Sequence, residues 1–198
     1  MERFFYHGME ACYGLYSYHI NIMINVLEKE GLRTRNDVRE HNNEKFEHVC
    51  LYKKNEEYDY SQDNFFLKSA RGAWIDHGFV YVVSPDILAE KVQYSPRTGF
   101  VGNGIITTDL VDEWRSVGPI PNTKIEGIAL PFDAIKEYLN EDINSNDKEI
   151  LEDKKQLIEL LLKLKSLAES MGIFIVDSDE KDFTDKLDEQ LNKKRKNK

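Results

Sequence analysis

Short runs of aromatic and β-branched residues constrain the fold of this chain more than any other feature. They occupy residues 3–6, 46–52, 79–84, 124–131 and 173–176, and each has the length and composition of a β-strand. The helix-like segments between them fall at irregular intervals, unlike the regular alternation that builds a doubly wound parallel sheet. The sequence therefore predicts an α+β domain. Further strand-like residues lie in 105–114, around a predicted turn.

Two longer segments, 19–31 and 148–172, carry apolar residues at the three- and four-residue spacing of an amphipathic helix. Each segment ends at a glycine, Gly31 or Gly172, which is a common stop signal. The apolar stripe of the second helix is Ile150, Leu157, Leu161, Leu164, Ala168 and Met171. We expect this stripe to pack on its own domain.

Two shorter helices are also expected. Residues 132–140 follow a proline and combine good helix formers with apolar residues at helical spacing. Residues 85–92 begin with Pro85, a residue that favours the first position of a helix. The sequence therefore predicts a helix directly after the 79–84 strand.

Composition limits the class of protein. The chain has 198 residues, 40% of them hydrophobic, and a formal net charge of −9. This length suits one domain with an appendage, and the negative charge argues against general binding of a nucleic-acid backbone. No apolar run approaches the roughly 20 residues that span a bilayer. Glu2 and Arg3 lead into an aromatic strand rather than a secretory leader, so we expect a cytoplasmic protein that does not bind a membrane.

The two cysteines, Cys12 and Cys50, have unrelated neighbours and no CxxC spacing. We expect two buried, reduced thiols; a single disulfide is the alternative. No cluster of His, Cys, Asp and Glu has the spacing of a metal site, so no metal is expected.

The chain divides into three predicted parts. Residues 1–140 form the core, residues 141–178 add a helix and a strand that pack on it, and residues 179–198 form a polar tail. Five of the last six residues, 193–198, are positively charged. Such a tail is usually solvated, and less often it contacts nucleic acid.

Five motifs carry a resemblance. They are "FYHGM" (5–9), "VLEKEGLRTRN" (26–36), "EHVCLYKK" (47–54), "GFVYVVSPDIL" (78–88) and "VDEWRSVGPIPNTKIEGIALP" (111–131). In their order and spacing they resemble the ADP-ribosyltransferase fold family. In that family an early strand ends in histidine, a helix closes on Gly-Leu, a middle strand supplies an aromatic or serine, and a late strand carries the catalytic glutamate. The resemblance implies a small split β-sandwich with a cleft for NAD, which is a substrate.

The resemblance also implies catalytic roles. His7 would hydrogen-bond the adenosine-side ribose of NAD, and Gly8 would let the backbone approach the dinucleotide. Glu113 would be the catalytic carboxylate. Breaking the nicotinamide–ribose bond develops positive charge on the sugar, and a fixed carboxylate facing that charge lowers the barrier, as in glycoside hydrolysis.

Further binding roles follow in the same way. Tyr52 or Tyr81 would stack on the nicotinamide, and Ser84 is the serine of the middle strand. Arg33 or Arg35 would meet the diphosphate, because the planar guanidinium pairs with phosphate oxygens.

Two residues are alternatives for these roles. His19 competes with His7 as the histidine that contacts NAD, and Glu126 competes with Glu113. Arginine-modifying members carry Gln or Glu two residues before the catalytic glutamate, where this chain has Val111. Arginine is therefore not the expected acceptor.

The predicted activity is transfer of ADP-ribose from NAD to a protein or nucleic-acid acceptor, as in an effector or toxin that acts inside a cell. The alternative is a non-catalytic interaction module on the same fold. A third hypothesis is a nucleic-acid-modifying enzyme whose basic tail helps to capture its substrate.

Overall fold

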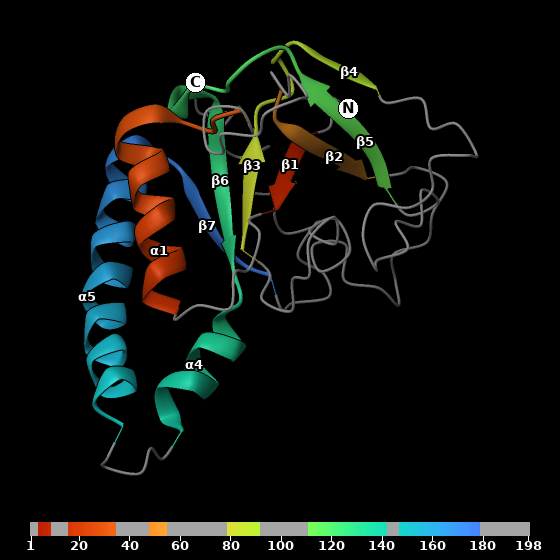
Figure 1. Ribbon diagram of the computed structural model, residues 1–198. Helices are drawn as coiled ribbons and strands as arrows, with labels where there is room; N and C mark the ends of the chain where they lie inside the picture. The colour runs from red at the N-terminus through yellow and green to blue at the C-terminus, as the bar shows by residue number, and fades with distance from the viewer. Residues whose placement is uncertain are drawn as a thin grey trace, which may run out of the picture.

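The structure is a computed structural model that describes residues 4–8, 16–34, 48–54, 79–91, 111–141 and 147–178 (Figure 1). Helices and strands alternate irregularly along these ranges. The elements are β1 (Phe5–Gly8), α1 (Tyr16–Asn25), the π-helical η1 (Val26–Glu30), β2 (Cys50–Lys54), β3 (Val80–Val83), β4 (Ala89–Lys91), β5 (Val111–Ser116), the 3-10 turn η3 (Asn122–Lys124), β6 (Ile125–Leu130), α4 (Phe132–Asn140), α5 (Lys148–Met171) and β7 (Phe174–Asp177).

The strands hydrogen-bond in the order β4-β5-β2-β1-β3-β6-β7. All neighbours are antiparallel except β6 and β7, which are parallel. This order contains two open parts, of four and of three strands, and the described strands do not close into a barrel. The α+β prediction is confirmed. The split β-sandwich that the resemblance implies stays a prediction; in the described strands, β1 is hydrogen-bonded to both β2 and β3.

One face of the sheet packs against the helices, and we call it the helix face. Phe5 pairs with Val83, and His7 pairs with Tyr81, which pairs in turn with Ile128. Paired residues share a face and alternate residues along a strand return to it, so these side chains lie together. All of them except His7 join a core cluster with four buried residues of α1 and η1, namely Ile20, Met23, Ile24 and Leu27.

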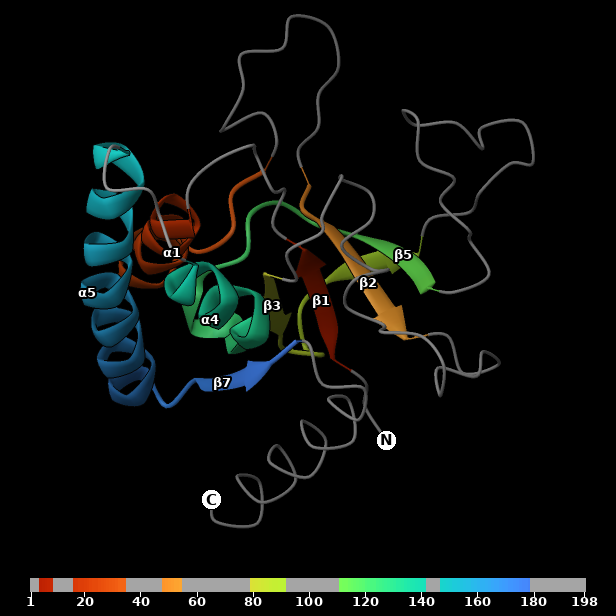
Figure 2. The ribbon, with the colours of Figure 1, turned by 90° about the horizontal axis from the view of Figure 1, so that it is seen from below.

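α5 lies beside α1 at one side of the sheet in both views (Figures 1 and 2). Its predicted stripe faces the core at Leu157, Leu164 and Ala168, which are buried. The Asp147 carboxylate accepts a hydrogen bond from the Ile150 amide and begins the helix. Gly172 ends it in the left-handed conformation, with φ +66°. Both predicted long helices are therefore confirmed.

A buried polar cluster joins three helices. The Asp153 carboxylate on α5 is only 3% exposed. It accepts hydrogen bonds from the Ser17 hydroxyl on α1 and, at 2.7 Å, from the Tyr138 hydroxyl on α4. Burial and the Asp153 carboxylate raise the pKa of the Tyr138 hydroxyl. The neighbouring Lys154 ammonium donates to the Glu141 carbonyl at 2.9 Å and so covers the end of α4.

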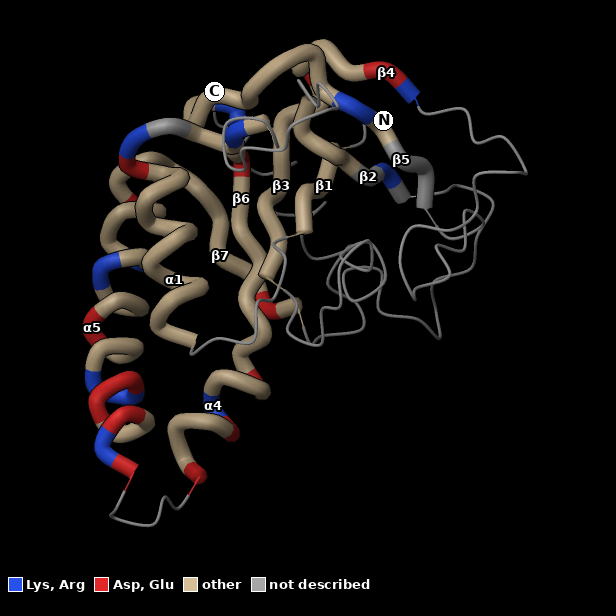
Figure 3. Tube along the Cα trace, viewed as in Figure 1, with Lys and Arg blue, Asp and Glu red and all other residues tan. Residues whose placement is uncertain are grey.

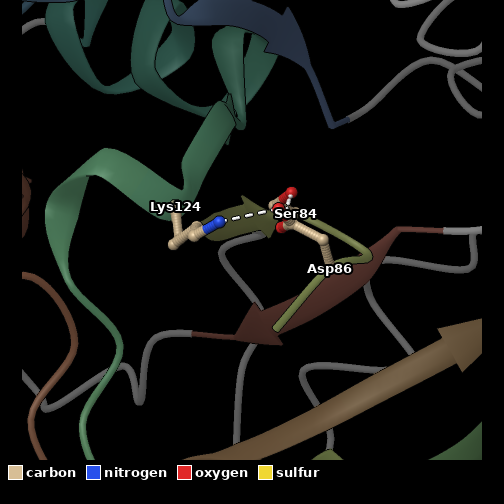
Figure 4. A network of polar contacts seen from close by, with 3 residues as sticks. All are labelled: Ser84, Asp86 and Lys124. Atoms are coloured by element: carbon tan, nitrogen blue, oxygen red, sulfur yellow. Dashed lines mark hydrogen bonds and ion pairs between the residues drawn. The ribbon is translucent and has the colours of Figure 1, made fainter. Parts of the chain in front are cut away.

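The predicted helix over residues 85–92 is wrong. The chain turns at Pro85 and Asp86 and then forms strand β4, which pairs with β5. Figure 4 shows the reason: the Asp86 carboxylate accepts from the Ser84 hydroxyl at 2.5 Å and from the Lys124 ammonium at 2.7 Å. These bonds, with Lys124 ahead of Ser84, lower the pKa of Asp86. A helix of only about two turns is marginal because its nucleation is costly, so these longer-range contacts decide the local structure.

Other sequence predictions hold with shifted bounds. The strands predicted at 79–84, 124–131 and 173–176 are β3, β6 and β7, and the helix predicted at 132–140 is α4. The strand predicted at 46–52 begins only at Cys50. Cys50 is exposed, so the prediction that it is buried is wrong. Cys12 and the 179–198 tail lie outside the described residues.

Candidate functional site

His7 lies near the end of β1, at the centre of the sheet. Its ring Nδ1 donates a hydrogen bond to the Cys50 carbonyl oxygen on β2 at 2.8 Å. Because a carbonyl only accepts, Nδ1 carries the proton and Nε2 is the acceptor in the neutral ring. Burial lowers the pKa of His7, and the hydrogen bond to Cys50 opposes that shift. His7 therefore presents an acceptor that a ligand hydroxyl group can use.

Tyr81 holds the His7 ring from the neighbouring strand. The two rings stack with centroids 6.1 Å apart and an interplanar angle of 26°. Tyr81 is 2% exposed, and burial raises the pKa of its hydroxyl. Among the described residues that hydroxyl has no hydrogen-bond partner. The Tyr81 ring, one of the two candidates for nicotinamide stacking, is thus buried and packed against the His7 ring.

Glu113 lies on β5, separated from β1 by the single strand β2. The register pairs Tyr6 with Tyr52 and Tyr52 with Glu113. The three positions therefore share one face, and His7, the next residue after Tyr6, belongs to the helix face. The register thus places the His7 and Glu113 positions on opposite faces of the sheet.

The alternative glutamate lies farther away. Val82 pairs with Gly127 and Val83 pairs with Ile125, so Glu126 is the extra residue of a β-bulge in β6. Two ladders, β1–β3 and β3–β6, separate it from β1. The structure does not bring Glu126 to His7.

The remaining predicted site residues are dispersed. His19 is 1% exposed and stacks on Phe79, with ring centroids 5.2 Å apart, inside the helix–sheet core. The Ser84 hydroxyl is bonded to Asp86. Gly8 ends β1 and pairs with Val80. Arg35 lies outside the described residues.

Arg33 is exposed at the other end of the sheet. It follows Leu32, which bridges to Ile120 just before β6 begins. β6 begins beside Val83, at the Phe5 end of β1, whereas His7 lies toward the end that Gly8 and Val80 mark. The arginine predicted to meet the diphosphate is therefore placed away from His7.

An aromatic and cationic cluster on β1, β2 and β5 was missed by sequence reasoning. The Lys53 ammonium lies 4.2 Å from the centroid of the Phe5 ring and 4.8 Å from that of the Trp114 ring. The two rings meet edge to face at 5.5 Å. The indole Nε1 of Trp114 is buried and has no hydrogen-bond partner among the described residues. The alternation of "EHVCLYKK" was the available signal, but it does not reveal which strand is the neighbour.

Charged groups along α5 are mixed rather than clustered. Figure 3 shows acidic and basic residues interspersed along α5. Within the described ranges, no group of three or more His, Cys, Asp or Glu side chains is arranged to hold a metal ion. None of the described helices combines the length and the apolar character that crossing a membrane requires.

Comparison of the chain with protein-family models, curated proteins and solved structures finds no match. Any functional conclusion therefore depends on the motifs and on the geometry of the described residues.

Proposed function

We propose that this chain binds NAD and transfers ADP-ribose from it to a macromolecular acceptor, with release of nicotinamide. The observation that carries the proposal is His7 at the end of a central strand. Its Nδ1 is committed to the Cys50 carbonyl, so its Nε2 is available to accept a ribose hydroxyl. Protein and nucleic-acid acceptors are both compatible with this proposal.

The spatial relation of the motifs supports it. The Tyr-His-Gly motif ends β1, and the Gly-Leu motif at 31–32 follows η1. Leu32 bridges to Ile120 of the "VGPIP" loop, so two motifs that are about 90 residues apart pack together. Glu113 lies on the strand that precedes this loop. The order of these three motifs along the fold supports the proposal.

NAD would supply the bond that is cleaved, and the residues of this chain would bind and orient it. His7 fits the ribose because its partly buried ring offers a neutral acceptor near the end of a strand. Glu113 would have to approach the same ligand to stabilise positive charge on the sugar. This requirement conflicts with the register, which puts the Glu113 position on the face opposite His7. Only a shift of one residue between β2 and β5 would move Glu113 to the helix face.

That conflict favours a second candidate function, a non-catalytic module on the same fold. Trp114 would leave the helix face in a one-residue shift, yet its ring packs against Phe5 there. The register that separates Glu113 from His7 is therefore stabilised by buried aromatic surface. A module of this kind would bind a ligand or partner without cleaving NAD.

One experiment separates the two functions. The full chain is incubated with NAD, and released nicotinamide is measured for wild type, Glu113→Gln and Glu126→Gln. The transfer proposal predicts release that falls on the order of 10²-fold or more in Glu113→Gln and stays within about two-fold in Glu126→Gln. The fold of each variant is checked by circular dichroism. Equal release from wild type and Glu113→Gln removes Glu113 from catalysis, and no release from wild type supports the non-catalytic module.

A further inference from the structure

We propose that the Tyr81 hydroxyl and the His7 imidazole together bind the two adjacent hydroxyl groups of a ribose. This inference rests on the proposed function for the identity of the ligand, and it names the part that is recognised, a cis-diol. It gives Tyr81 a polar contact in place of ring stacking on nicotinamide. The juxtaposition that carries it is a buried hydroxyl with no partner in the described part of the chain, beside a ring nitrogen that accepts hydrogen bonds.

One row of side chains across the sheet contains both groups. His7 pairs with Tyr81 across the β1–β3 ladder. In the β1–β2 register His7 lies opposite Leu51, and Leu51 pairs with Trp114 of β5. Because cross-strand partners share a face, this row runs over β5, β2, β1 and β3 on the helix face, in the order Trp114, Leu51, His7, Tyr81.

The Tyr81 hydroxyl is the group that most needs a ligand. The side chain is 2% exposed, and among the described residues its oxygen has no hydrogen-bond partner. Burial raises the pKa of this hydroxyl, so it keeps its proton and can both donate and accept. A buried hydroxyl without a partner costs free energy. Such groups are rare in native structures, and a bound molecule is one way in which they are satisfied.

His7 offers the complementary group. Its Nδ1 is committed to the Cys50 carbonyl, so its Nε2 is the acceptor. The His7 and Tyr81 rings lie nearly parallel, with centroids 6.1 Å apart and an interplanar angle of 26°. A cis-diol matches this pair, because one hydroxyl donates to Nε2 while its neighbour bonds to the Tyr81 hydroxyl. The His7 residue is only half-buried, so the ligand approaches over its ring.

A second polar atom in the same row supports a ligand that lies across the strands. The indole Nε1 of Trp114 is buried, and no described residue accepts a hydrogen bond from it. Trp114 lies two strands from His7, which is about 10 Å across a sheet. A dinucleotide such as NAD is longer than that. A ligand whose ribose meets His7 and Tyr81 can therefore also bring an acceptor atom to Nε1.

The test uses ADP, 2′-deoxy-ADP and 3′-deoxy-ADP, which differ from one another only in the ribose hydroxyl groups. Their dissociation constants are measured by calorimetry with the full chain. The variants are Tyr81→Phe, which removes only the hydroxyl, and His7→Phe, which removes the acceptor and keeps a ring against Tyr81. Tyr138→Phe is the matched control, because it removes a hydroxyl that bonds to the Asp153 carboxylate at 2.7 Å.

We expect wild type to bind ADP on the order of 10-fold more tightly than either deoxy form, because each loss leaves one protein group without its partner. Tyr81→Phe should lose the preference against one deoxy form and keep it against the other. His7→Phe should show the reverse. A general distortion of the site would instead weaken the binding of all three ligands alike.

Stability gives a second readout. Removal of a hydroxyl that has no protein partner should leave the midpoint of urea denaturation of the ligand-free chain unchanged or higher. Tyr138→Phe should lower that midpoint and keep the wild-type preference for ADP. If Tyr81→Phe discriminates among the three ligands as wild type does, its hydroxyl does not meet the ribose and the inference is wrong. If Tyr81→Phe fails to fold, the preferences of wild type and His7→Phe decide the test.

The outcomes separate this inference from the transfer reaction. The crossed preferences, in a chain that never releases nicotinamide, support the inference and overturn the reaction. Nicotinamide release from a wild-type chain that binds ADP and both deoxy forms equally overturns the inference and leaves the reaction standing. Failure of wild type to bind ADP at millimolar concentration also overturns the inference.

Discussion

The carbonyl oxygen of Ile120 lies 2.0 Å from the position that a Cβ atom on Gly31 would occupy. Gly31 has a φ of +69° and closes η1, with its amide donating to the Val26 carbonyl. The next residue, Leu32, exchanges two backbone hydrogen bonds with Ile120, of 2.8 and 2.9 Å. The end of η1 and the loop before β6 therefore pack so closely that only glycine, which has no side chain, fits at position 31.

Gly31→Ala should consequently be strongly destabilising. The new methyl group would collide with the backbone of Ile120, and alanine disfavours a positive φ. We expect the free energy of unfolding to fall by about 3 kcal/mol or more, measured by urea denaturation. Gly118→Ala is the matched control, because Gly118 also has a positive φ of +80° but nothing lies within 4 Å of its added Cβ. A loss as large in Gly118→Ala would show that the collision is not the cause.

The buried carboxylate of Asp153 gives a second prediction. In Asp153→Asn, the new side chain keeps one acceptor oxygen and replaces the other with an N–H₂ group. Either the Ser17 hydroxyl or the Tyr138 hydroxyl would then lose its acceptor. We expect a loss of about 1–3 kcal/mol in the free energy of unfolding. Glu152→Gln makes the same substitution at the neighbouring, exposed carboxylate. It should change the free energy of unfolding by less than about 0.5 kcal/mol. Equal effects of the two variants would contradict a buried role for Asp153.

How much of this arrangement the sequence could predict depends on how local each signal is. Val80–Val83, Ile125–Leu130 and the helix that ends at Gly172 follow from apolar spacing and stop residues, and they were predicted. β4 was not, because Ala89–Lys91 become a strand only through pairing with β5, and a lysine 38 positions after Asp86 holds the turn before them. Propensity describes a segment alone, whereas an edge strand is decided by its neighbour.

The candidate site shows the same division. The sequence predicted His7 and Gly8 at the end of a strand because the motif is contiguous. It could not place Lys53 beside Phe5, since the register between β1 and β2 depends on contacts made across the intervening chain. For the same reason the sequence could not foresee that the Tyr81 ring packs against the His7 ring.

The lowered pKa of His7 predicts how stability depends on pH. Burial lowers the pKa of His7 in the folded chain below its ordinary value of 6.5, so the unfolded chain takes up the proton more readily. The neutral His7 ring therefore stabilises the folded chain relative to the unfolded one. This stabilisation is present above pH 6.5 and is lost as the pH falls through and below that value. We therefore expect the free energy of unfolding to fall between pH 7.5 and pH 5.5, and to fall less in His7→Gln. An identical pH dependence in the variant would show that His7 does not contribute. His48→Gln provides a comparison, because burial and the charge of Arg115 also lower the pKa of His48.

The pairing of β2 with β5 gives the prediction that bears most directly on function. Cross-strand nuclear Overhauser effects should connect the Tyr52 backbone to Glu113 and the Leu51 backbone to Trp114. We expect this register because Trp114 packs against Phe5 on the helix face, and a slip of one residue would carry that ring to the other face. Contacts that pair Tyr52 with Trp114 instead would move Glu113 to the face of His7 and Lys53. In that case Glu113 would share the face of His7, and the chemistry of ADP-ribose transfer would no longer conflict with the fold.

Trp114→Ala is the complementary variant, because removal of the ring weakens the preference for one register. If nicotinamide release rises in Trp114→Ala, the slipped register is the one that acts on NAD; if release is absent in both chains, the observed register is that of a binding module.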